Sequence, residues 1–214
     1  MEYNGGAIVA MTGRDCVAIA CDLRLGIQYA TVACDFPKVY RIHDHLYVGL
    51  PGLATDAQTV IAKLRFKEKL YALREERLMK PNVFANMCSA LLYEKRFGPF
   101  FVEPIIAGLT PVESRDDSGN LLSTRYEPFI TAMDLIGAGV DTKDFVVGGT
   151  SSEQLYGVCE AMFKPDMESE DLFETVSQCL LAAVDRDCLS GWGAVVHIIT
   201  PEKTIIRELK SRQD

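Results

Sequence analysis

The order in which strand-like and helix-like segments follow one another most constrains what this sequence can fold into. Short apolar runs bounded by turn residues predict strands, and apolar residues spaced three or four apart predict helices. The expected strands cover residues 7–11, 16–21, 39–42, 45–49, 105–108, 129–133, 194–199 and 204–207. The expected helices cover residues 55–78, 81 to about 98, 152–163 and 169–187. The chain thus alternates strands, a helix pair, strands, a second helix pair and strands.

This order predicts an α+β fold with four layers. Two groups of strands form two antiparallel sheets, and each helix pair covers the outer face of one sheet, which gives a helix–sheet–sheet–helix sandwich. No repeat and no Ser/Pro/Gly-rich linker divides the 214 residues, so we expect one domain over residues 1–214. The polar, turn-rich segment 112–126 is expected to be an exposed hairpin loop.

The helices carry recognisable end signals. Thr55 or Asp56 is the expected cap of the first helix, Pro81 fits the first turn of the second, and Glu170 and Asp171 suit the start of the fourth. The expected buried positions of the first helix are Val60, Leu64, Leu70, Leu73 and Leu78.

Charge and apolar patterning exclude several classes of function. The chain has 22 basic and 30 acidic residues and a net charge of −8, which argues against nucleic acid or an anionic membrane as the main partner. The longest apolar run, residues 179–184, is far shorter than the roughly 18 residues of a spanning helix. The first residues lack the basic start and apolar core of a signal peptide. We therefore expect a soluble protein that stays inside the cell.

The seven cysteines are expected to be free thiols buried in a reducing compartment. They show no C-x-x-C pair, their number is odd, and most lie within apolar runs. The cysteines are Cys16, Cys21, Cys34, Cys88, Cys159, Cys179 and Cys188.

Five sequence blocks carry a family resemblance. They are YNGGA (residues 3–7), DFPK (35–38), GLATD (52–56), LYEKRFGP (92–99) and DRDCLSG (185–191). In this order they resemble the β-type subunits of the 20S proteasome, which belong to the N-terminal nucleophile hydrolase superfamily. The four-layer sandwich is the fold that this resemblance implies.

The resemblance also implies a catalytic apparatus. Active members use an N-terminal threonine, freed by cleavage after a glycine, whose hydroxyl attacks and whose own amine accepts the proton. Asp22 and Arg24 match the family's aspartate and arginine, Lys38 matches its lysine 16 positions after Asp22, and Asp187 and Ser190 match the distal pair. The glycine loop at residues 49–52 lies where active members place a backbone N–H for the oxyanion.

The nucleophile itself is missing. Counting back from Asp22 places Gly6 at the position of the threonine, and Gly149 replaces the serine of the family's Gly-Ser-Gly turn. Only five residues precede Gly6, and no Gly-Thr junction lies there. The Gly149–Thr150 pair is a poor maturation site because cleavage would remove the first strands. We therefore expect no catalytic residue, with Asp22, Lys38, Asp187 and Ser190 as a vestigial structural network.

Other conspicuous residues have plainer interpretations. We expect His43, Asp44 and His45 to form a solvated turn rather than a metal clip, and His197 to be a satisfied core or interface histidine. The basic positions of the first helix alternate with Glu68, Glu75 and Glu76, which favours a solvated or subunit-facing surface over a binding patch. These positions are Arg65, Lys67, Lys69, Arg74 and Arg77.

By resemblance, the chain is a noncatalytic β subunit that works with other α and β subunits, between neighbours of beta type-2 and beta type-4. No cofactor is required, but a structural Mg²⁺ could bind oxygens of Val184, Asp187, Ser190 and Asp214. The resemblance implies a location in the cytoplasm and nucleus. A self-processing amidohydrolase acting alone remains the alternative, and exposed-looking Phe97, Phe100 and Phe101 suit a chain that contacts partners.

Overall fold

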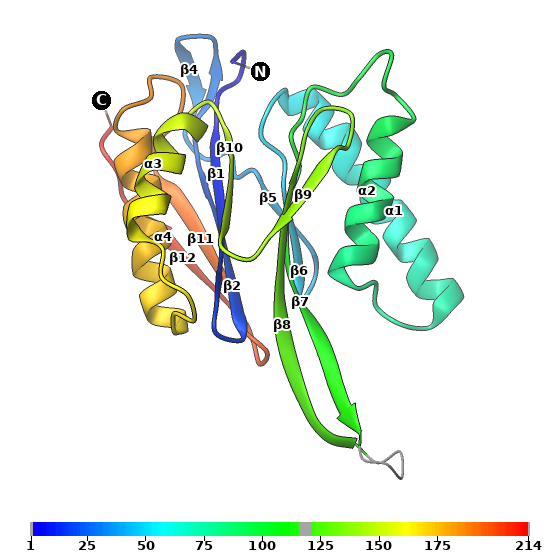
Figure 1. Cartoon of the computed structure of the whole chain (residues 1–214). Helices are drawn as coiled ribbons and strands as arrows, with labels where there is room; N and C mark the ends of the chain where they lie inside the picture. Colours follow the sequence, from blue (N-terminus) through cyan, green and yellow to red (C-terminus); the bar gives the residue numbers. More distant parts are fainter. Residues whose placement is uncertain (1, 116–120, 214) are drawn as a thin grey trace.

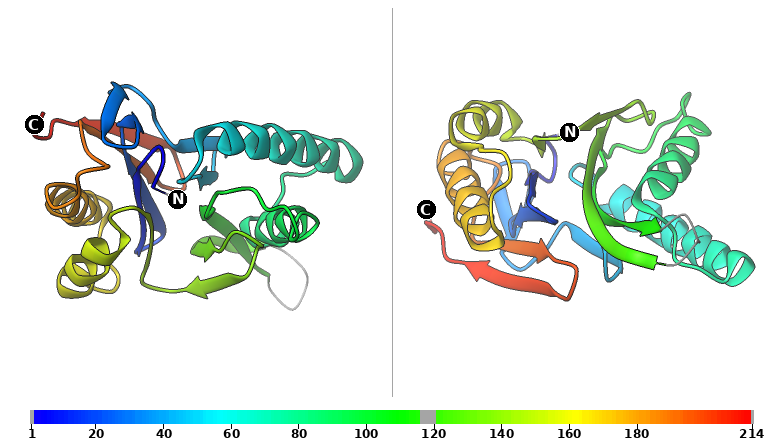
Figure 2. Two further views of the ribbon diagram at one scale, coloured as in Figure 1. Left: turned by 90° about the horizontal axis from the view of Figure 1, so that it is seen from above. Right: turned by 60° about the horizontal axis from the view of Figure 1, so that its bottom comes forward.

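The computed structural model describes residues 2–115 and 121–213 and has four layers (Figure 1). From left to right in Figure 1 they are the pair α3 and α4, a five-stranded sheet, a second five-stranded sheet, and the pair α1 and α2. The views from above and below show the same two helix pairs on opposite outer sides (Figure 2). The expected sandwich of two antiparallel sheets between helix layers is confirmed.

Each sheet collects strands from distant parts of the chain. The first sheet has the order β10-β1-β2-β11-β12, with bounds Phe145–Gly149, Ala7–Gly13, Cys16–Asp22, Ala194–Ile199 and Thr204–Leu209. The second has the order β5-β6-β7-β8-β9, with bounds Val39–His43, Leu46–Gly49, Ile105–Arg115, Leu121–Met133 and Gly139–Thr142. A small separate hairpin joins β3 (Leu25–Ile27) to β4 (Ala30–Ala33). The helices are α1 (Ala54–Glu75), α2 (Pro81–Tyr93), α3 (Ser152–Met162) and α4 (Ser169–Val184).

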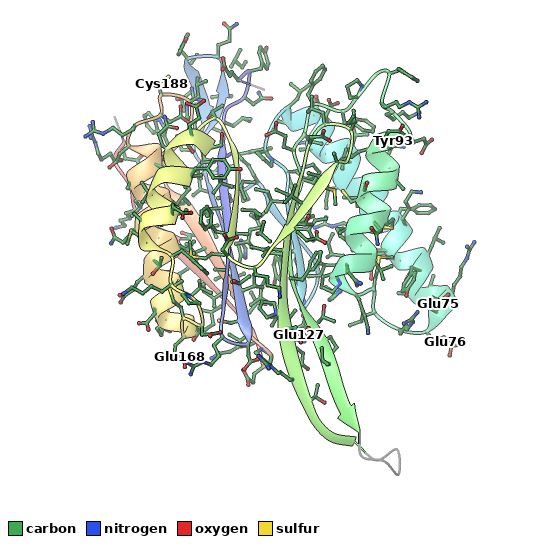
Figure 3. All side chains as sticks on the ribbon, viewed as in Figure 1. Glu75, Glu76, Tyr93, Glu127, Glu168 and Cys188 are labelled. Carbon is green, nitrogen blue, oxygen red and sulfur yellow. The ribbon has the colours of Figure 1, made fainter. Side chains whose placement is uncertain are left out.

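The continuous apolar strands are explained by sheets that are buried on both faces. Successive side chains of a strand point to opposite faces. In β1, Ala7, Val9 and Met11 pack in the core under α3 and α4, whereas Ile8 and Ala10 pack between the two sheets. A third core fills the space between the second sheet and α1 with α2. Side chains fill all three spaces (Figure 3).

The starts of the helices agree only in part with the sequence expectations. Pro81 occupies the first turn of α2, and Glu170 with Asp171 lies in the first turn of α4, as expected. The expected cap of α1 is wrong, because the helix begins one residue earlier and neither Thr55 nor Asp56 caps it. Asp56 instead accepts a hydrogen bond from the backbone of Phe101 at 2.9 Å.

The expected buried face of α1 is correct only in its first half. Val60 and Leu64 are fully buried, but Leu70, Leu73 and Leu78 are 37%, 78% and 56% exposed. Leu78 lies beyond the helix, which ends at Glu75. The periodicity was a weak guide here because a helix face stays buried only as far as a neighbour covers it. Glu68, expected on the charged surface, is buried.

The segment 112–126 is mostly strand rather than loop. β7 and β8 pair from Ile105 opposite Ala132 to Arg115 opposite Leu121, with one shift of register between Ser114 and Arg115, and residues 116–120 lie outside the described part. This ribbon extends past the last residue that pairs with β6, Gly108, and leaves the body of the fold near Glu127 (Figure 3). The sequence missed four further strands, β3, β4, β9 and β10, which are short.

The cysteines are free, and five of them are buried, whereas Cys34 and Cys188 are exposed against expectation. Of the three phenylalanines that follow α2, Phe97 and Phe101 are exposed and Phe100 packs against the core beneath the helices. Among the described residues, no helix is long and apolar enough to cross a membrane.

Candidate functional site

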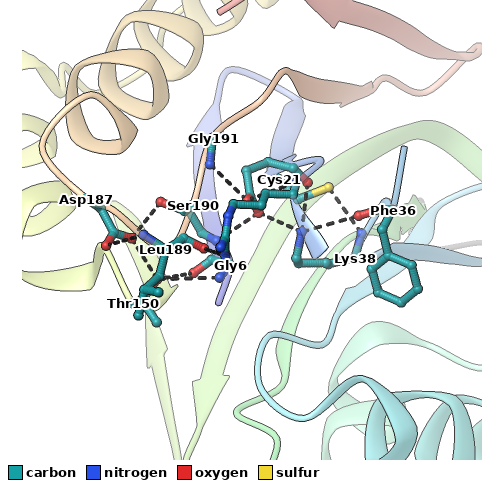
Figure 4. A network of polar contacts seen from close by, with 12 residues as sticks. Gly6, Cys21, Phe36, Lys38, Thr150, Asp187, Leu189, Ser190 and Gly191 are labelled. Atoms are coloured by element: carbon teal, nitrogen blue, oxygen red, sulfur yellow. Dashed lines mark hydrogen bonds and ion pairs between the residues drawn. The ribbon is translucent and has the colours of Figure 1, made fainter. Parts of the chain in front are cut away.

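A buried ion pair lies where the two sheets approach one another. Asp22 is the last residue of β2, and Lys38 directly precedes β5 of the other sheet. Lys38 Nζ lies 2.8 Å from Asp22 Oδ1, and the side chains are 4% and 0% exposed. Lys38 Nζ also donates to the carbonyl oxygens of Asp22 and Phe36, each at 3.2 Å, so all three N–H groups of the ammonium have acceptors (Figure 4).

The Asp22 carboxylate is also fully used. Its Oδ1 accepts the backbone N–H of Ala7 at 2.9 Å, and its Oδ2 accepts those of Arg24 at 3.3 Å and Gly191 at 3.1 Å. A buried carboxylate with an opposite charge and several N–H donors retains its charge at modest cost. Asp22 thereby ties together β1, the segment after β2 and the loop after α4.

Arg24, two residues after Asp22, performs a related task. Its guanidinium, on a residue 1% exposed, donates to Leu189 O at 3.0 Å, Gln28 O at 3.1 Å and Thr31 Oγ1 at 3.0 Å. These bonds fix the β3–β4 hairpin against the loop after α4. The planar fork of an arginine suits this multiple contact better than a lysine would.

Gly6 lies beside this ion pair, and no room for a side chain remains there. A Cβ built on Gly6 would lie 2.8 Å from both Cδ and Cε of Lys38 and 3.6 Å from Asp22 Oδ1. Its φ of +145° is also a conformation that residues with side chains rarely adopt. The nitrogen of Gly6 is an amide that approaches Thr150 Oγ1 at 3.4 Å. The position thus offers neither a hydroxyl nor a free amine.

The distal residues form a second cluster on the other side of Gly6. Asp187 Oδ2 accepts from Ser190 Oγ at 2.6 Å and from Thr150 Oγ1 at 2.7 Å, while Oδ1 accepts from Leu189 N at 3.1 Å. Thr150 N donates to Gly6 O at 2.7 Å. The structure therefore brings Asp22, Lys38, Asp187 and Ser190 around Gly6, as the resemblance implied.

Thr150 and Asn4 are the members of this region that sequence reasoning missed. The sequence singles out Thr150 only as half of a possible cleavage pair, yet in the structure Thr150 connects Gly6, which directly precedes β1, with Asp187. Asn4 Oδ1 accepts the backbone N–H of Ala54 at 2.9 Å and so caps α1 from a distance, and Asn4 Nδ2 donates to Gly26 O at 2.9 Å. The only sequence signal for Asn4 is its place in the YNGGA block, and this block does not indicate the partner Ala54, which is 50 residues away.

Gly5 and Gly149 lie where two backbone segments approach too closely to leave room for a side chain. Gly149 has φ +97°, and a Cβ there would overlap the carbonyl oxygen of Gly6. Gly5 has φ +71°, and a Cβ there would overlap the carbonyl oxygen of Leu189. The serine of the family's turn could not occupy residue 149 on this backbone.

Two positions of the glycine loop at residues 49–52, Leu50 and Pro51, offer no free backbone donor. Leu50 N donates to Lys38 O at 2.9 Å, and Pro51 has no N–H. The loop therefore holds the backbone of Lys38.

In the segment of residues 43–45, the ring of His43 is engaged within the fold. His43 Nε2 lies 2.9 Å from Met79 O and its Nδ1 accepts His45 N at 3.2 Å, so both ring nitrogens are used locally. His43 is half-buried and burial lowers its pKa, so the expected solvated turn is wrong for this residue. Among the described residues, no group of three or more His, Cys, Asp or Glu side chains could hold a metal.

His197 is buried as expected, but the expected hydrogen-bond partners of its ring are missing among the described residues. Within the described chain neither ring nitrogen has a hydrogen-bond partner, and the ring packs on Tyr47 with centroids 5.4 Å apart. Burial lowers its pKa from 6.5 to about 4, so the ring is neutral at physiological pH.

The candidate cation ligands lie close together. Val184, Asp187 and Ser190 line one hollow at the end of α4, and Asp214 lies outside the described residues. The side-chain oxygens of Asp187 already accept three hydrogen bonds, so a hard cation would have to use carbonyl oxygens here. The Mg²⁺ site stays a prediction.

Comparisons with known proteins give one consistent result. The profile of the family described as proteasome subunit matches residues 2–199. Proteasome subunit beta type-3-B of Arabidopsis thaliana is 59% identical over 213 residues, covering 100% of this chain and 98% of that protein. The beta type-3 subunits of Dictyostelium discoideum and Saccharomyces cerevisiae are 56% and 51% identical, with the same coverage.

Replacing Lys38 by methionine tests the structural role of the ion pair. Lys38→Met keeps an unbranched apolar stem but leaves the Asp22 carboxylate uncompensated, so we expect a loss of about 3–5 kcal/mol in the free energy of unfolding. Asp22→Asn combined with Lys38→Met should lose less than the single variant, because neither charge of the pair is then left buried without its partner. Urea unfolding measures both.

The matched control is Arg14→Met, which breaks the exposed pair between Arg14 and Glu168 (58% and 64% exposed). That change should cost less than about 1 kcal/mol. Equal unfolding midpoints for Lys38→Met and the wild type would contradict a structural role.

His197→Phe tests the buried neutral histidine. The pKa of His197 is about 4 in the folded chain and 6.5 in the unfolded chain. Between these pH values the unfolded state binds a proton at this residue and the folded state does not. His197 therefore lowers the free energy of unfolding progressively as the pH falls from 6.5 to 4. We expect wild type to lose about 3 kcal/mol more than His197→Phe between pH 6.5 and 4. The free energy of unfolding of both proteins is measured at several pH values in this range. Equal pH dependence of the wild type and His197→Phe would contradict the lowered pKa of His197.

Proposed function

The chain belongs to the proteasome subunit family, and from this premise we propose that it is a noncatalytic beta type-3 subunit of the 20S core particle. In this role it contributes one wall segment to a β ring and to the chamber in which neighbouring subunits cleave protein substrates. Its own contribution to ubiquitin-dependent protein degradation is then geometric.

One observation carries the noncatalytic assignment. The stem of Lys38 lies where a side chain at residue 6 would begin, and the nitrogen of that residue is part of the peptide chain. The reaction of the family needs a hydroxyl and a free amine on one residue, and Gly6 provides neither. A self-processing amidohydrolase acting alone would fail at the same point, so this alternative is disfavoured.

Partners follow from the same premise. We propose a place between beta type-2 and beta type-4 subunits, beneath an α ring and opposite a second β ring. Large apolar side chains are exposed on separate elements, including Tyr29 (81%), Leu73 (78%) and Phe97 (92%). Such exposure on several faces suits a subunit that is enclosed by different neighbours.

The proposal includes the domain organisation, the location and the cofactor needs of the subunit. The subunit would act as one domain in the cytoplasm and nucleus, where its particle degrades proteins, and it would need no cofactor. A Mg²⁺ held by oxygens near Val184, Asp187 and Ser190 would brace the loop after α4 without taking part in chemistry.

Installing a threonine at residue 6 tests whether only the hydroxyl is missing. Gly6→Thr recreates a Gly-Thr junction, but its Cβ would lie 2.8 Å from the Lys38 stem. We expect neither the wild type nor this variant to lose residues 1–5 or to react with an electrophilic probe for N-terminal threonines. Intact mass of the chain, taken from assembled particles, reads out both events.

Active subunits in the same particles are the positive control for that probe. Cleavage before residue 6 together with an adduct on the wild-type chain would overturn the noncatalytic assignment. The same result in Gly6→Thr alone would contradict the expected steric block by Lys38.

Isolation of the native protein tests the proposed assembly. We expect native mass spectrometry to find the chain only in particles of many subunits, and lysine-directed crosslinking to connect it with beta type-2 and beta type-4 subunits. A stable, functional monomer would contradict the role, and crosslinks to other β types alone would contradict the neighbours.

A further inference from the structure

A threonine followed by a proline lies in the tight turn between β11 and β12. Thr200 N donates to Lys203 O at 3.0 Å, so Pro201 and Glu202 are the two central residues of a hairpin turn. Pro201 suits the first of these positions because its ring fixes φ and it has no N–H to leave unpaired. The first of the six residues of β11 pairs with Asp22, so the turn lies about 20 Å from that carboxylate, at the lower end of the sheet in Figure 1.

The residues of this turn, TPEK (200–203), match a recognition motif of protein kinases. Proline-directed kinases phosphorylate a serine or threonine that is followed by proline, and some of them also need a basic residue three positions after the hydroxyl residue. Lys203 is that basic residue, and it is exposed. The only other serine or threonine before a proline is Thr110, which lies within β7 and has the acidic Glu113 three positions later.

The hydroxyl of Thr200 is held by the turn rather than by the core. Its Oγ1 lies 2.8 Å from Lys203 O and 3.2 Å from Glu202 Oε2, and it accepts the backbone N–H of Lys203 at 3.3 Å. A kinase binds its substrate as an extended segment, so these few bonds must open first. Because β12 is the last strand of its sheet, the end of this hairpin opens at a lower free energy than the central strands do.

Two arginines from other elements share a groove with this turn. Thr200, Arg14 of the β1–β2 turn and Arg125 of β8 all line the groove. Both guanidinium groups form exposed ion pairs, Arg14 with Glu168 and Arg125 with Asp15. Exposed pairs of this kind contribute little to stability. Either arginine can therefore exchange its carboxylate for a stronger acceptor at small cost.

We propose that Thr200 is a phosphorylation site and that Arg14 and Arg125 bind the phosphate group. Thr200 Oγ1 attacks the γ-phosphorus of ATP, a new O–P bond forms, and the bond from the γ-phosphorus to the bridging oxygen breaks, so that ADP leaves. The hydroxyl proton passes to the catalytic aspartate of the kinase. The phosphate carries a charge of about −1.5 to −2 and three acceptor oxygens, so it competes for the guanidinium groups better than one carboxylate does.

The phosphate connects parts of the fold that lie on different sheets. Arg125 belongs to the ribbon of β7 and β8, whereas Arg14 and Thr200 belong to turns of the first sheet. Asp15 and Glu168 line the same groove and repel the phosphate, so we expect binding to require both arginines. Phosphorylation would thus fasten the ribbon to the end of the first sheet.

Phosphorylation of assembled particles tests the site. The particles are treated with a phosphatase, then with a purified cyclin-dependent kinase and ATP, and tryptic peptides are sequenced by mass spectrometry. We expect one phosphate at Thr200, in the peptide of residues 187–203, and none at Thr110. A synthetic peptide of residues 195–206 is the positive control. If the kinase labels this peptide but not Thr200 in particles, or labels neither, the proposal is wrong.

Variants separate this motif from general phosphorylation. Thr200→Ala should abolish the label on the peptide, and Lys203→Ala should lower its rate of formation severalfold because the kinase loses the basic residue. Thr110→Ala is the matched control and should leave the rate unchanged. Equal rates for Lys203→Ala and the wild type would contradict recognition of the motif.

Hydrogen exchange tests the two arginines. Phosphorylation should slow the exchange of the backbone amides of residues 124–127 severalfold, because the ribbon is then fastened. Arg125→Gln should be phosphorylated equally well but show no slowing, whereas Arg77→Gln, which changes an exposed arginine beyond α1, should behave as the wild type. Equal exchange before and after phosphorylation would overturn the binding by the arginines. None of these results bears on whether the chain is a noncatalytic ring subunit.

Discussion

The buried contact between Asp22 and Lys38 is the constraint on which the rest of the site depends. Asp22 ends β2 of one sheet and Lys38 directly precedes β5 of the other, so their contact at 2.8 Å ties the two sheets together. The carboxylate then gathers backbone N–H groups from residues 7, 24 and 191, which fixes the start of β1 and the loop after α4. Removing either charge would leave the other one buried without compensation, and this cost preserves the pair whether or not it serves catalysis.

Much of the fold could be predicted because the strands are apolar throughout. An uninterrupted run such as residues 16–21 can be stable only in a sheet that is covered on both sides, and the element order supplies two sheets and two coverings. The same reasoning failed where burial depends on how far a neighbour extends. Leu73 matches the helical period of α1 but is 78% exposed, and the 112–126 segment continues as a paired ribbon despite its polar residues.

The part of the site that could be predicted is the set of residues that match the spacing of the family pattern. Asp22, Lys38, Asp187 and Ser190 lie together around Gly6, as the family pattern implied. Thr150 and Asn4 could not be assigned, because their partners are brought near only by the fold: Asp187 is 37 residues from Thr150, and Ala54 is 50 from Asn4. The missing hydrogen bonds of His197 were equally invisible, since the sequence shows a histidine in an apolar strand but not what faces it.

The residues around Gly6 explain why this chain cannot keep its present structure here and also carry out the chemistry of the active family members. A free amine at residue 6 would require a chain that begins there, and so the loss of Asn4, which caps α1 and bonds to Gly26 on the β3–β4 hairpin. Gly5 and Gly6 let the backbone pass between Leu189 and the Lys38 stem with no space for a Cβ at either residue. The polypeptide that fills the reaction site is therefore also the part that fastens α1 and the small hairpin to the sheets. Restoring a hydroxyl alone would oppose this packing, because the contacts that stabilise the subunit are the ones that an N-terminal nucleophile would have to give up.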